Sequence, residues 1–136
     1  MSPRRQTQDI LDVLQSLIER TDPSEVLTQG NPEYTAHSAP WAAQNDLHPR
    51  VVFAPRSVAS LARIVAFLYQ TDLDFNVRGH GFKSPSAQDV LISMMNFNGF
   101  EYDKDQKLAT VGVGATWAEV AKNMEKHDPE YSSKFE

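Results

Sequence analysis

The feature that most constrains the fold is a strand–helix–strand pattern across residues 51–79. Residues 51–55, VVFAP, form a short run rich in β-branched side chains that ends at a proline. After Ser57, a residue type that caps helices, apolar side chains recur at helical spacing as far as Tyr69. The run LDFNVRG, residues 73–79, is typical of a second strand. The pattern predicts a βαβ unit, whose crossover is right-handed in nearly all proteins.

Upstream of this unit the chain is predicted to be mainly helical. Residues 6–20 carry a single apolar stripe, which indicates an amphipathic helix. The following DPSE has an aspartate to cap, a proline for the first helical position and a glutamate at the capping-box distance, so we expect a short helix over residues 23–29. Residues 31–48 show no clean period and are interpreted as an ordered arm anchored by Tyr34 and Trp41.

Downstream, a strand, a hairpin and a helix are predicted. Residues 90–94, VLISM, favour a strand, and residues 99–115 favour a hairpin with its turn at residues 103–107. The sequence TWAE, starting at Thr116, is a capping box that opens the last helix. The expected apolar face of that helix comprises Trp117, Val120, Ala121 and Met124. We expect Trp117 to be core and the residues after the helix to form a polar tail.

Composition excludes several classes of function. The 136 residues suit one domain or part of one, and the absence of cysteine excludes disulfides, thiolate zinc sites and a cysteine nucleophile. A net charge of −5 argues against a nucleic-acid partner. No segment has the apolar length of a signal peptide or a membrane span, so we expect a soluble, cytoplasmic protein without membrane contact.

The stretch most suggestive of chemistry is NVRGHGFKS, residues 76–84. A glycine-rich turn at the end of a strand exposes main-chain N–H groups, which form a concavity that binds phosphate oxygens. The third glycine of the dinucleotide fingerprint is absent, because Ser84 stands at its place. A loop and a strand follow rather than a helix, so a nicotinamide-binding Rossmann site is disfavoured. A phosphate-holding turn remains the functional interpretation.

Two other features have competing interpretations. His80 can be a base, a ligand or a hydrogen-bonded surface residue, and the four histidines follow no metal-binding spacing. Gly112 and Gly114 alternate with valines. They indicate either a strand pressed against a neighbouring chain segment or a bare face that admits a flat ligand ring. No Ser-His-Asp set or carboxylate pair can be argued from spacing, so no catalytic residue is assigned.

The order of these motifs resembles the start of the FAD-binding domain of FAD-linked oxidases, which include the PCMH-type and berberine-bridge-like enzymes. The matching motifs are Val51-Val52 with Pro55, the turn at residues 78–81, the Ile92–Asn96 strand end and the VGATW of residues 113–117. Residues 33–41, EYTAHSAPW, are also similar to the segment that precedes the domain in that family.

The resemblance implies a cofactor and the residues that hold it. In the family the arginine–glycine turn wraps the FAD pyrophosphate, and the later Gly-x-Gly shapes the cofactor slot. The implied cofactor-binding set is Arg78, Gly79, His80, Gly81, Phe82, Lys83, Ser84, Gly112 and Gly114. Many relatives tether the flavin through a histidine where this chain has Phe82, so we expect non-covalent FAD; a shifted alignment that makes His80 the tether is the alternative.

The resemblance also implies the fold and its extent. We expect an α+β chain that forms the N-terminal half of a PCMH-type FAD-binding domain: a βαβ unit, then a strand and a hairpin, with helices in front. Residues 1–48 would be the N-terminal helices and arm, and residues 49–136 the partial domain. The rest of the cofactor domain and the whole substrate domain have no counterpart here, so we expect a truncated cofactor domain.

Three functional hypotheses follow. The first is an FAD-linked oxidoreductase that oxidises a small organic substrate, such as a secondary metabolite, with flavin as hydride acceptor. The second is a non-catalytic truncated remnant, or an accessory or interaction module, whose uncovered strand edges and apolar faces favour self-association or a partner chain. The third is an unrelated α+β binding domain.

Overall fold

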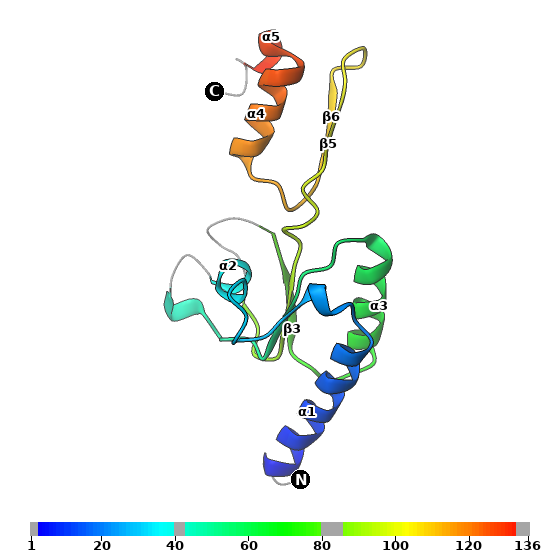
Figure 1. Ribbon diagram of the computed structural model, residues 1–136, viewed down its shortest axis with the longest axis vertical. Helices are drawn as coiled ribbons and strands as arrows, with labels where there is room; N and C mark the ends of the chain where they lie inside the picture. The colour runs from blue at the N-terminus through cyan, green and yellow to red at the C-terminus, as the bar shows by residue number, and fades with distance from the viewer. Residues whose placement is uncertain (1–2, 40–42, 80–85, 133–136) are drawn as a thin grey trace.

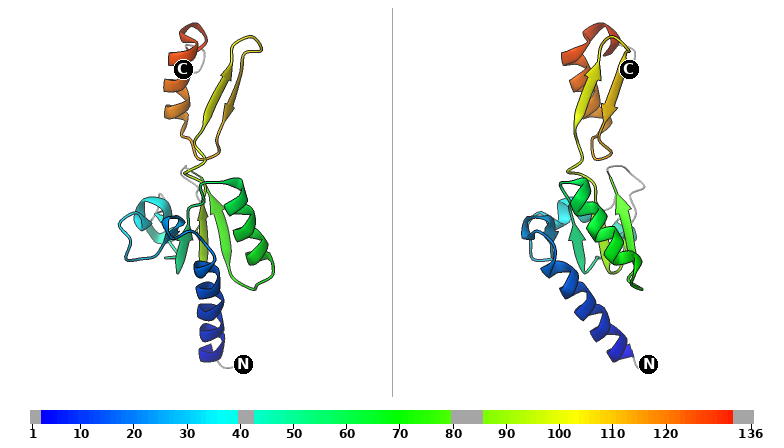
Figure 2. Two further views of the ribbon diagram at one scale, coloured as in Figure 1. Left: turned by 45° about the vertical axis from the view of Figure 1, so that its right-hand side comes forward. Right: turned by 90° about the vertical axis from the view of Figure 1, so that its right-hand side faces the viewer.

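The computed structural model describes residues 3–39, 43–79 and 86–132. Two regions are evident in Figures 1 and 2. The first, here called the sheet unit, runs to residue 99 and holds a four-stranded sheet with helices on both faces. The second, the hairpin unit of residues 100–132, projects from one end of the sheet unit.

The sheet is mixed, with the strand order β1-β2-β4-β3. β1 (Val26–Leu27) pairs antiparallel with β2 (Val51–Phe53), whereas β4 (Val90–Ser93) runs parallel to both β2 and β3 (Phe75–Arg78). Helix α3 (Val58–Tyr69) connects β2 to β3, as the strand–helix–strand pattern predicts. The two strands of that pattern are not neighbours, because the later strand β4 inserts between them and hydrogen-bonds to each.

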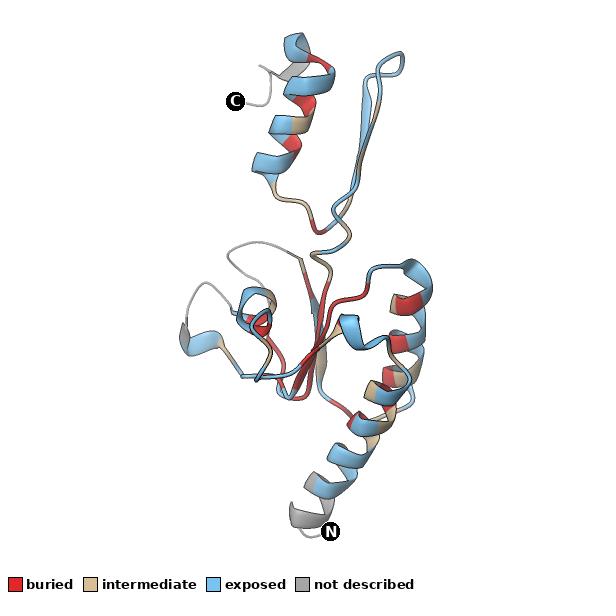
Figure 3. Ribbon diagram, viewed as in Figure 1, coloured by how far each residue is buried: buried red, intermediate tan, exposed pale blue. Residues whose placement is uncertain are grey.

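Apolar side chains from both faces of the central strands form two cores. Helices α1 (Pro3–Glu19) and α3 cover one face, where Phe53, Ile64 and Ile92 are almost completely buried. Helix α2 (Tyr34–Ser38) covers the other face. Figure 3 shows the buried residues gathered along the central strands. Because β2 and β4 are covered on both faces, the runs VVF of β2 and VLI of β4 are continuously apolar rather than alternating.

The segment after α1 differs from its prediction. The helix expected over residues 23–29 is wrong, because only the 3-10 turn η1 (Pro23–Glu25) forms before the chain extends into β1. The capping signal itself is confirmed, since Asp22 accepts a hydrogen bond from the Ser24 amide at 2.9 Å. The helix does not continue because Val26 pairs with Phe53 in the sheet.

The arm that follows contains two short helical segments, α2 and η2 (Ala43–Asn45). Tyr34 is an anchor as predicted: its side chain is buried and its hydroxyl donates to the Pro49 carbonyl at 2.8 Å. Trp41, the second predicted anchor, lies outside the described residues.

The hairpin unit contains β5 (Phe100–Asp103), β6 (Leu108–Val111), α4 (Trp117–His127) and α5 (Pro129–Ser132). The predicted turn is confirmed and includes Lys107 at a φ of 58°. The predicted capping box of α4 is also present, with Thr116 and Glu119 exchanging hydrogen bonds at 3.1 and 3.2 Å. The short helix α5 stands where a polar tail is expected.

Trp117 is a clear error of the sequence analysis. Its side chain is 81% exposed, and Ala121 is exposed as well. The hairpin covers only a narrow stripe of α4, in which Val120 and Met124 are buried. The periodicity correctly marks an apolar side of the helix, but it does not show how much of that side finds a neighbour.

Candidate cofactor site

The predicted site begins at one edge of the sheet. The parallel strands β2, β4 and β3 all end there, at Phe53, Ser93 and Arg78. In open parallel sheets, ligands bind in the crevice beyond the carboxyl ends of the strands. Gly79, the first glycine of the predicted phosphate-holding turn, follows β3 at this edge.

The two glycine motifs, separate in the sequence, meet beside this edge. A Cβ atom placed on Gly79 would lie 2.9 Å from the carbonyl oxygen of Val113. The main chain at the end of β3 is therefore in close contact with the segment between Gly112 and Gly114. A side chain at Gly79 would force the two segments apart.

Gly112 and Gly114 are explained by packing. A Cβ on Gly112 would overlap the Phe97 carbonyl oxygen, and one on Gly114 would overlap that of Met94. The amide of Gly114 donates to Phe97 O at 2.8 Å, which holds the two segments together. The geometry supports the first interpretation of these glycines, a segment pressed against its neighbour.

Arg78 lies buried at the end of β3, with 7% of its surface exposed. Its Nη1 donates to the Ala39 carbonyl at 3.1 Å, and its buried Nε has no hydrogen-bond partner among the described residues. Burial lowers the pKa of the guanidinium, an effect that the charge of Asp46 partly opposes. Within the described part of the chain, no carboxylate forms an ion pair with Arg78. A buried positive charge with an unused donor is suited to an anionic ligand.

The arm lies over the same edge of the sheet. The His37 ring nitrogen Nδ1 is 2.7 Å from the hydroxyl oxygen of Ser93, directly beside Arg78 in the sheet register. Asn96 donates from Nδ2 to the Ala54 carbonyl at 3.0 Å, linking the ends of β4 and β2. Sequence reasoning did not assign Ser93 and His37 to the site. The two residues are 56 positions apart in the sequence, so no local sequence pattern predicts their contact.

The remaining predicted site residues, His80, Gly81, Phe82, Lys83 and Ser84, lie outside the described residues. The structure therefore places Arg78, Gly79, Gly112 and Gly114 near one another and gives no position for the rest of the turn.

Other ligand types find little support among the residues that the structure describes. They contain no group of three histidine, aspartate or glutamate side chains that could hold a metal ion. His127 Nδ1 lies 2.8 Å from the Asn123 carbonyl oxygen, and His48 lies 3.6 Å from Asp46. In the same part of the chain, no helix has the length and apolar character needed to cross a bilayer.

Parallel strands β2, β4 and β3, with a buried arginine and close-packed glycines beside their carboxyl ends, are typical of the class of proteins with a ligand site at that edge of the sheet. Residues 49–132 match the family model described as "FAD binding domain". The match covers more than half of the chain, so the protein belongs to the FAD-binding domain family. This match confirms FAD as the predicted cofactor of the family.

Curated relatives are fungal flavoenzymes. The chain is 26% identical to the FAD-dependent monooxygenase yanF of Aspergillus niger, over 90% of this chain and 23% of that protein. It is 33% identical to the FAD-dependent monooxygenase prx3 of Penicillium roqueforti, over 64% of this chain and 18% of that protein. The chain thus spans less than a quarter of the length of these relatives.

Solved structures confirm the predicted α+β fold and its resemblance to berberine-bridge-like proteins. Physcomitrella patens BBE-like 1 superposes with a TM-score of 0.68 at 21% identity, over 85% of this chain and 26% of that one. Phl p 4.0202, a glucose dehydrogenase, superposes with a TM-score of 0.68 at 16% identity, over 87% of this chain and 27% of that one. At these identities the likeness concerns the fold.

Proposed function

We propose that this chain supplies the diphosphate-binding part of the FAD site in an FAD-linked oxidoreductase. The observation that carries the proposal is the buried guanidinium of Arg78 at the carboxyl end of β3, whose Nε finds no partner in the part of the chain that the structure describes. A diphosphate would compensate the desolvation that lowers the pKa of this guanidinium.

The neighbouring main chain fits the same ligand. The close approach of Gly79 to Val113 keeps side chains away from the start of the turn, as main-chain recognition of phosphate requires. The proposed cofactor-binding set is Arg78, Gly79, His80, Gly81, Phe82, Lys83, Ser84, Gly112 and Gly114. FAD is held without a covalent bond in this proposal, since Phe82 stands at the expected tether position.

Residues 49–136 act in this proposal as part of a cofactor domain, and residues 1–48 as helices and an arm that support it. When bound, FAD supplies the chemistry of accepting a hydride from a small organic substrate. The fungal monooxygenases among the relatives support a secondary metabolite as that substrate. No residue of this chain is assigned the role of a substrate base.

A second candidate function is a non-catalytic interaction module, which self-associates or binds a partner chain. It is favoured by the hairpin unit, where every residue of β6 is exposed and Trp117 is 81% exposed. Exposed strand edges and apolar side chains promote association.

Titration with FAD and with riboflavin tests the first proposal, because riboflavin lacks the diphosphate. We expect quenching of flavin fluorescence with FAD only, and competition by ADP. Arg78→Gln should weaken FAD binding about tenfold, the loss of one charge-assisted hydrogen bond. Lys104→Gln, which removes an exposed positive charge in the turn between β5 and β6, is the matched control.

Equal binding of riboflavin, or an unchanged affinity in Arg78→Gln, would contradict the diphosphate assignment. Absence of flavin binding together with concentration-dependent association in size-exclusion chromatography would favour the interaction module.

A further inference from the structure

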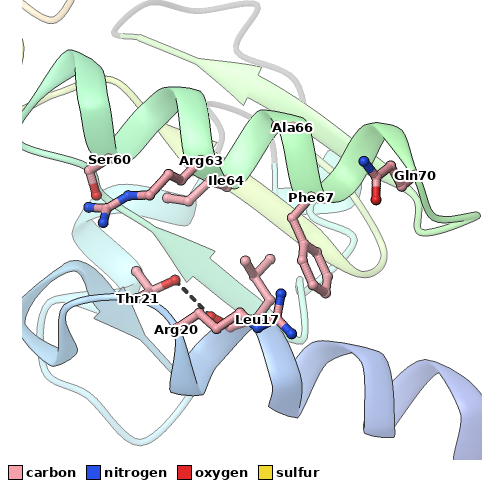
Figure 4. A pocket seen from close by; sticks show the side chains of 9 residues that line it. All are labelled: Leu17, Arg20, Thr21, Ser60, Arg63, Ile64, Ala66, Phe67 and Gln70. Atoms are coloured by element: carbon pink, nitrogen blue, oxygen red, sulfur yellow. Dashed lines mark hydrogen bonds between the residues drawn. The ribbon is translucent and has the colours of Figure 1, made fainter.

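A hollow lies between helices α1 and α3, away from the cofactor edge (Figure 4). Its volume is about 310 Å³, within the range of small-molecule sites. Leu17 and Ile64, both almost fully buried, form an apolar floor. Arg20 and Arg63 also line it. The hollow therefore combines an apolar floor with two cationic side chains.

Neither arginine forms an ion pair within the described residues. The Arg20 guanidinium lies 5.6 Å from the centre of the Phe67 ring, while that of Arg63 extends toward Ser60 at the other end of the hollow. Two unpaired cations around one hollow stand out in a chain with a net charge of −5. Their fields add within the hollow and favour a negatively charged occupant.

The other polar groups of the hollow leave mainly donors available. The Thr21 hydroxyl already donates to the Leu17 carbonyl at 2.8 Å, and the Ser60 hydroxyl to the Glu25 carboxylate at 3.0 Å. What remains to bind a ligand is the two guanidiniums and the side-chain amide of Gln70. Guanidinium groups match the geometry of carboxylates.

A neighbouring hollow provides an internal comparison. It lies nearer the N-terminus of α1, shares Gln70 with the first hollow, has a volume of about 460 Å³, and is also partly apolar, with Ile10 and Val13 in its wall. Its charged lining residues are Asp9 and Asp72, so it repels the ligand that the first hollow attracts. Anion binding that depends on charge should distinguish the two.

We propose that the hollow between α1 and α3 binds an organic monocarboxylate with a short aliphatic body. The body packs on Leu17 and Ile64, and the carboxylate pairs with the arginines. The buried carboxylate of Glu25 stands behind Ser60, so the ligand's carboxylate favours the Arg20 end of the hollow.

The test uses the intact chain and octanoate, followed by chemical shifts of the methyl groups of Leu17 and Ile64. Octanamide, which is uncharged, and acetate, which lacks the aliphatic body, are the ligand controls. We expect saturable shifts with octanoate and at least about tenfold weaker binding of either control.

Charge variants locate the carboxylate. Arg20→Gln should weaken octanoate binding about tenfold and Arg63→Gln by a smaller factor, since one charge-assisted contact is lost at each. Arg56→Gln makes the same change of net charge outside the hollow and should leave binding unchanged. Ala66→Phe places a ring at the hollow's wall and should reduce binding without altering charge.

Four results would each overturn the proposal. These are equal binding of octanamide, equal weakening by Arg56→Gln, shifts centred on Ile10 and Val13, and unchanged affinity in Ala66→Phe. Because FAD takes no part in these measurements, the outcome is independent of the proposed cofactor site.

Discussion

The sheet unit and the hairpin unit are stabilised in different ways. In the sheet unit, every residue of β2 and β4 is buried, with helices on both faces. In the hairpin unit, every residue of β6 is exposed, and the buried apolar side chains of α4 are Val120 and Met124. A layered core thus supports the first region, whereas the second has one thin contact between a helix and a hairpin.

In the hairpin unit, side-chain hydrogen bonds and close main-chain packing take the place of a layered core. Asp128, only 5% exposed, accepts a hydrogen bond from the Tyr102 hydroxyl at 2.6 Å and from Lys107 Nζ at 3.1 Å. Gly112 and Gly114 anchor the unit's base against the end of the sheet unit. Two-stranded hairpins are marginal alone, so the hairpin unit should open locally before the sheet unit unfolds.

The largest effect should come from the core of the sheet unit. Phe53→Ala should lower the free energy of unfolding by about 3–5 kcal/mol, because it removes a fully buried ring between two packed layers. Denaturant titration followed by circular dichroism measures this change. Tyr69→Ala removes an aromatic ring that is 87% exposed and should change stability little. Similar losses in the two variants would show that the layered core is not the main source of stability.

The next largest effect should come from the junction. Gly114→Ala should cost roughly 3 kcal/mol, because its Cβ meets main-chain atoms of Met94 and Met95 that cannot rotate away. Hydrogen exchange should show faster opening of β5 and β6 than of β4. Gly30→Ala is the matched control, since nothing lies within 4 Å of its added Cβ. If both variants exchange alike, the close crossing does not hold the two units together.

The sheet unit was the more predictable of the two regions. The strands β2, β3 and β4, helix α3 and the Ser57 cap follow from local periodicity and capping. The structure confirms the cap through a hydrogen bond from the Ser60 amide at 3.1 Å. The insertion of β4 between β2 and β3 is set by tertiary pairing and could not be read from segments taken singly. β1 was missed because two residues are too short to show alternation.

In the candidate site, the sequence marks Arg78, Gly79, Gly112 and Gly114 but not their contacts. The glycines are visible because they are unusual in a strand-rich segment, yet only coordinates show that Gly79 faces Val113. Exposure of Trp117 was unpredictable for a similar reason, since periodicity describes one helix and burial depends on its neighbours.

A smaller effect, confined to the hairpin unit, is expected from its buried carboxylate. Asp128→Asn should cost roughly 2 kcal/mol, because the hydrogen bonds from Tyr102 and Lys107 lose their charged acceptor. Exchange should accelerate in β5, β6 and α4 while β2 and β4 stay protected. Asp105→Asn changes the same charge in the exposed turn and should have no comparable effect. Loss of protection across β2 and β4 would mean that the units unfold together.

The smallest effect sharpens the comparison, because a side-chain cap begins an α-helix in each unit, Ser57 for α3 and Thr116 for α4. Ser57→Ala and Thr116→Ala each remove a hydrogen bond to a helix amide, at 3.1 and 3.2 Å, and each should cost about 1 kcal/mol. If the units differ as argued, Ser57→Ala lowers the denaturation midpoint of the whole chain. The effect of Thr116→Ala should instead be seen mainly as faster hydrogen exchange in α4, since that helix is expected to open without the sheet.

Val58→Ala, at the exposed first position of α3, controls for substitutions near a cap. Equal shifts of the midpoint in Ser57→Ala and Thr116→Ala would indicate one cooperative unit, because a cap on a locally opening helix contributes little to global unfolding.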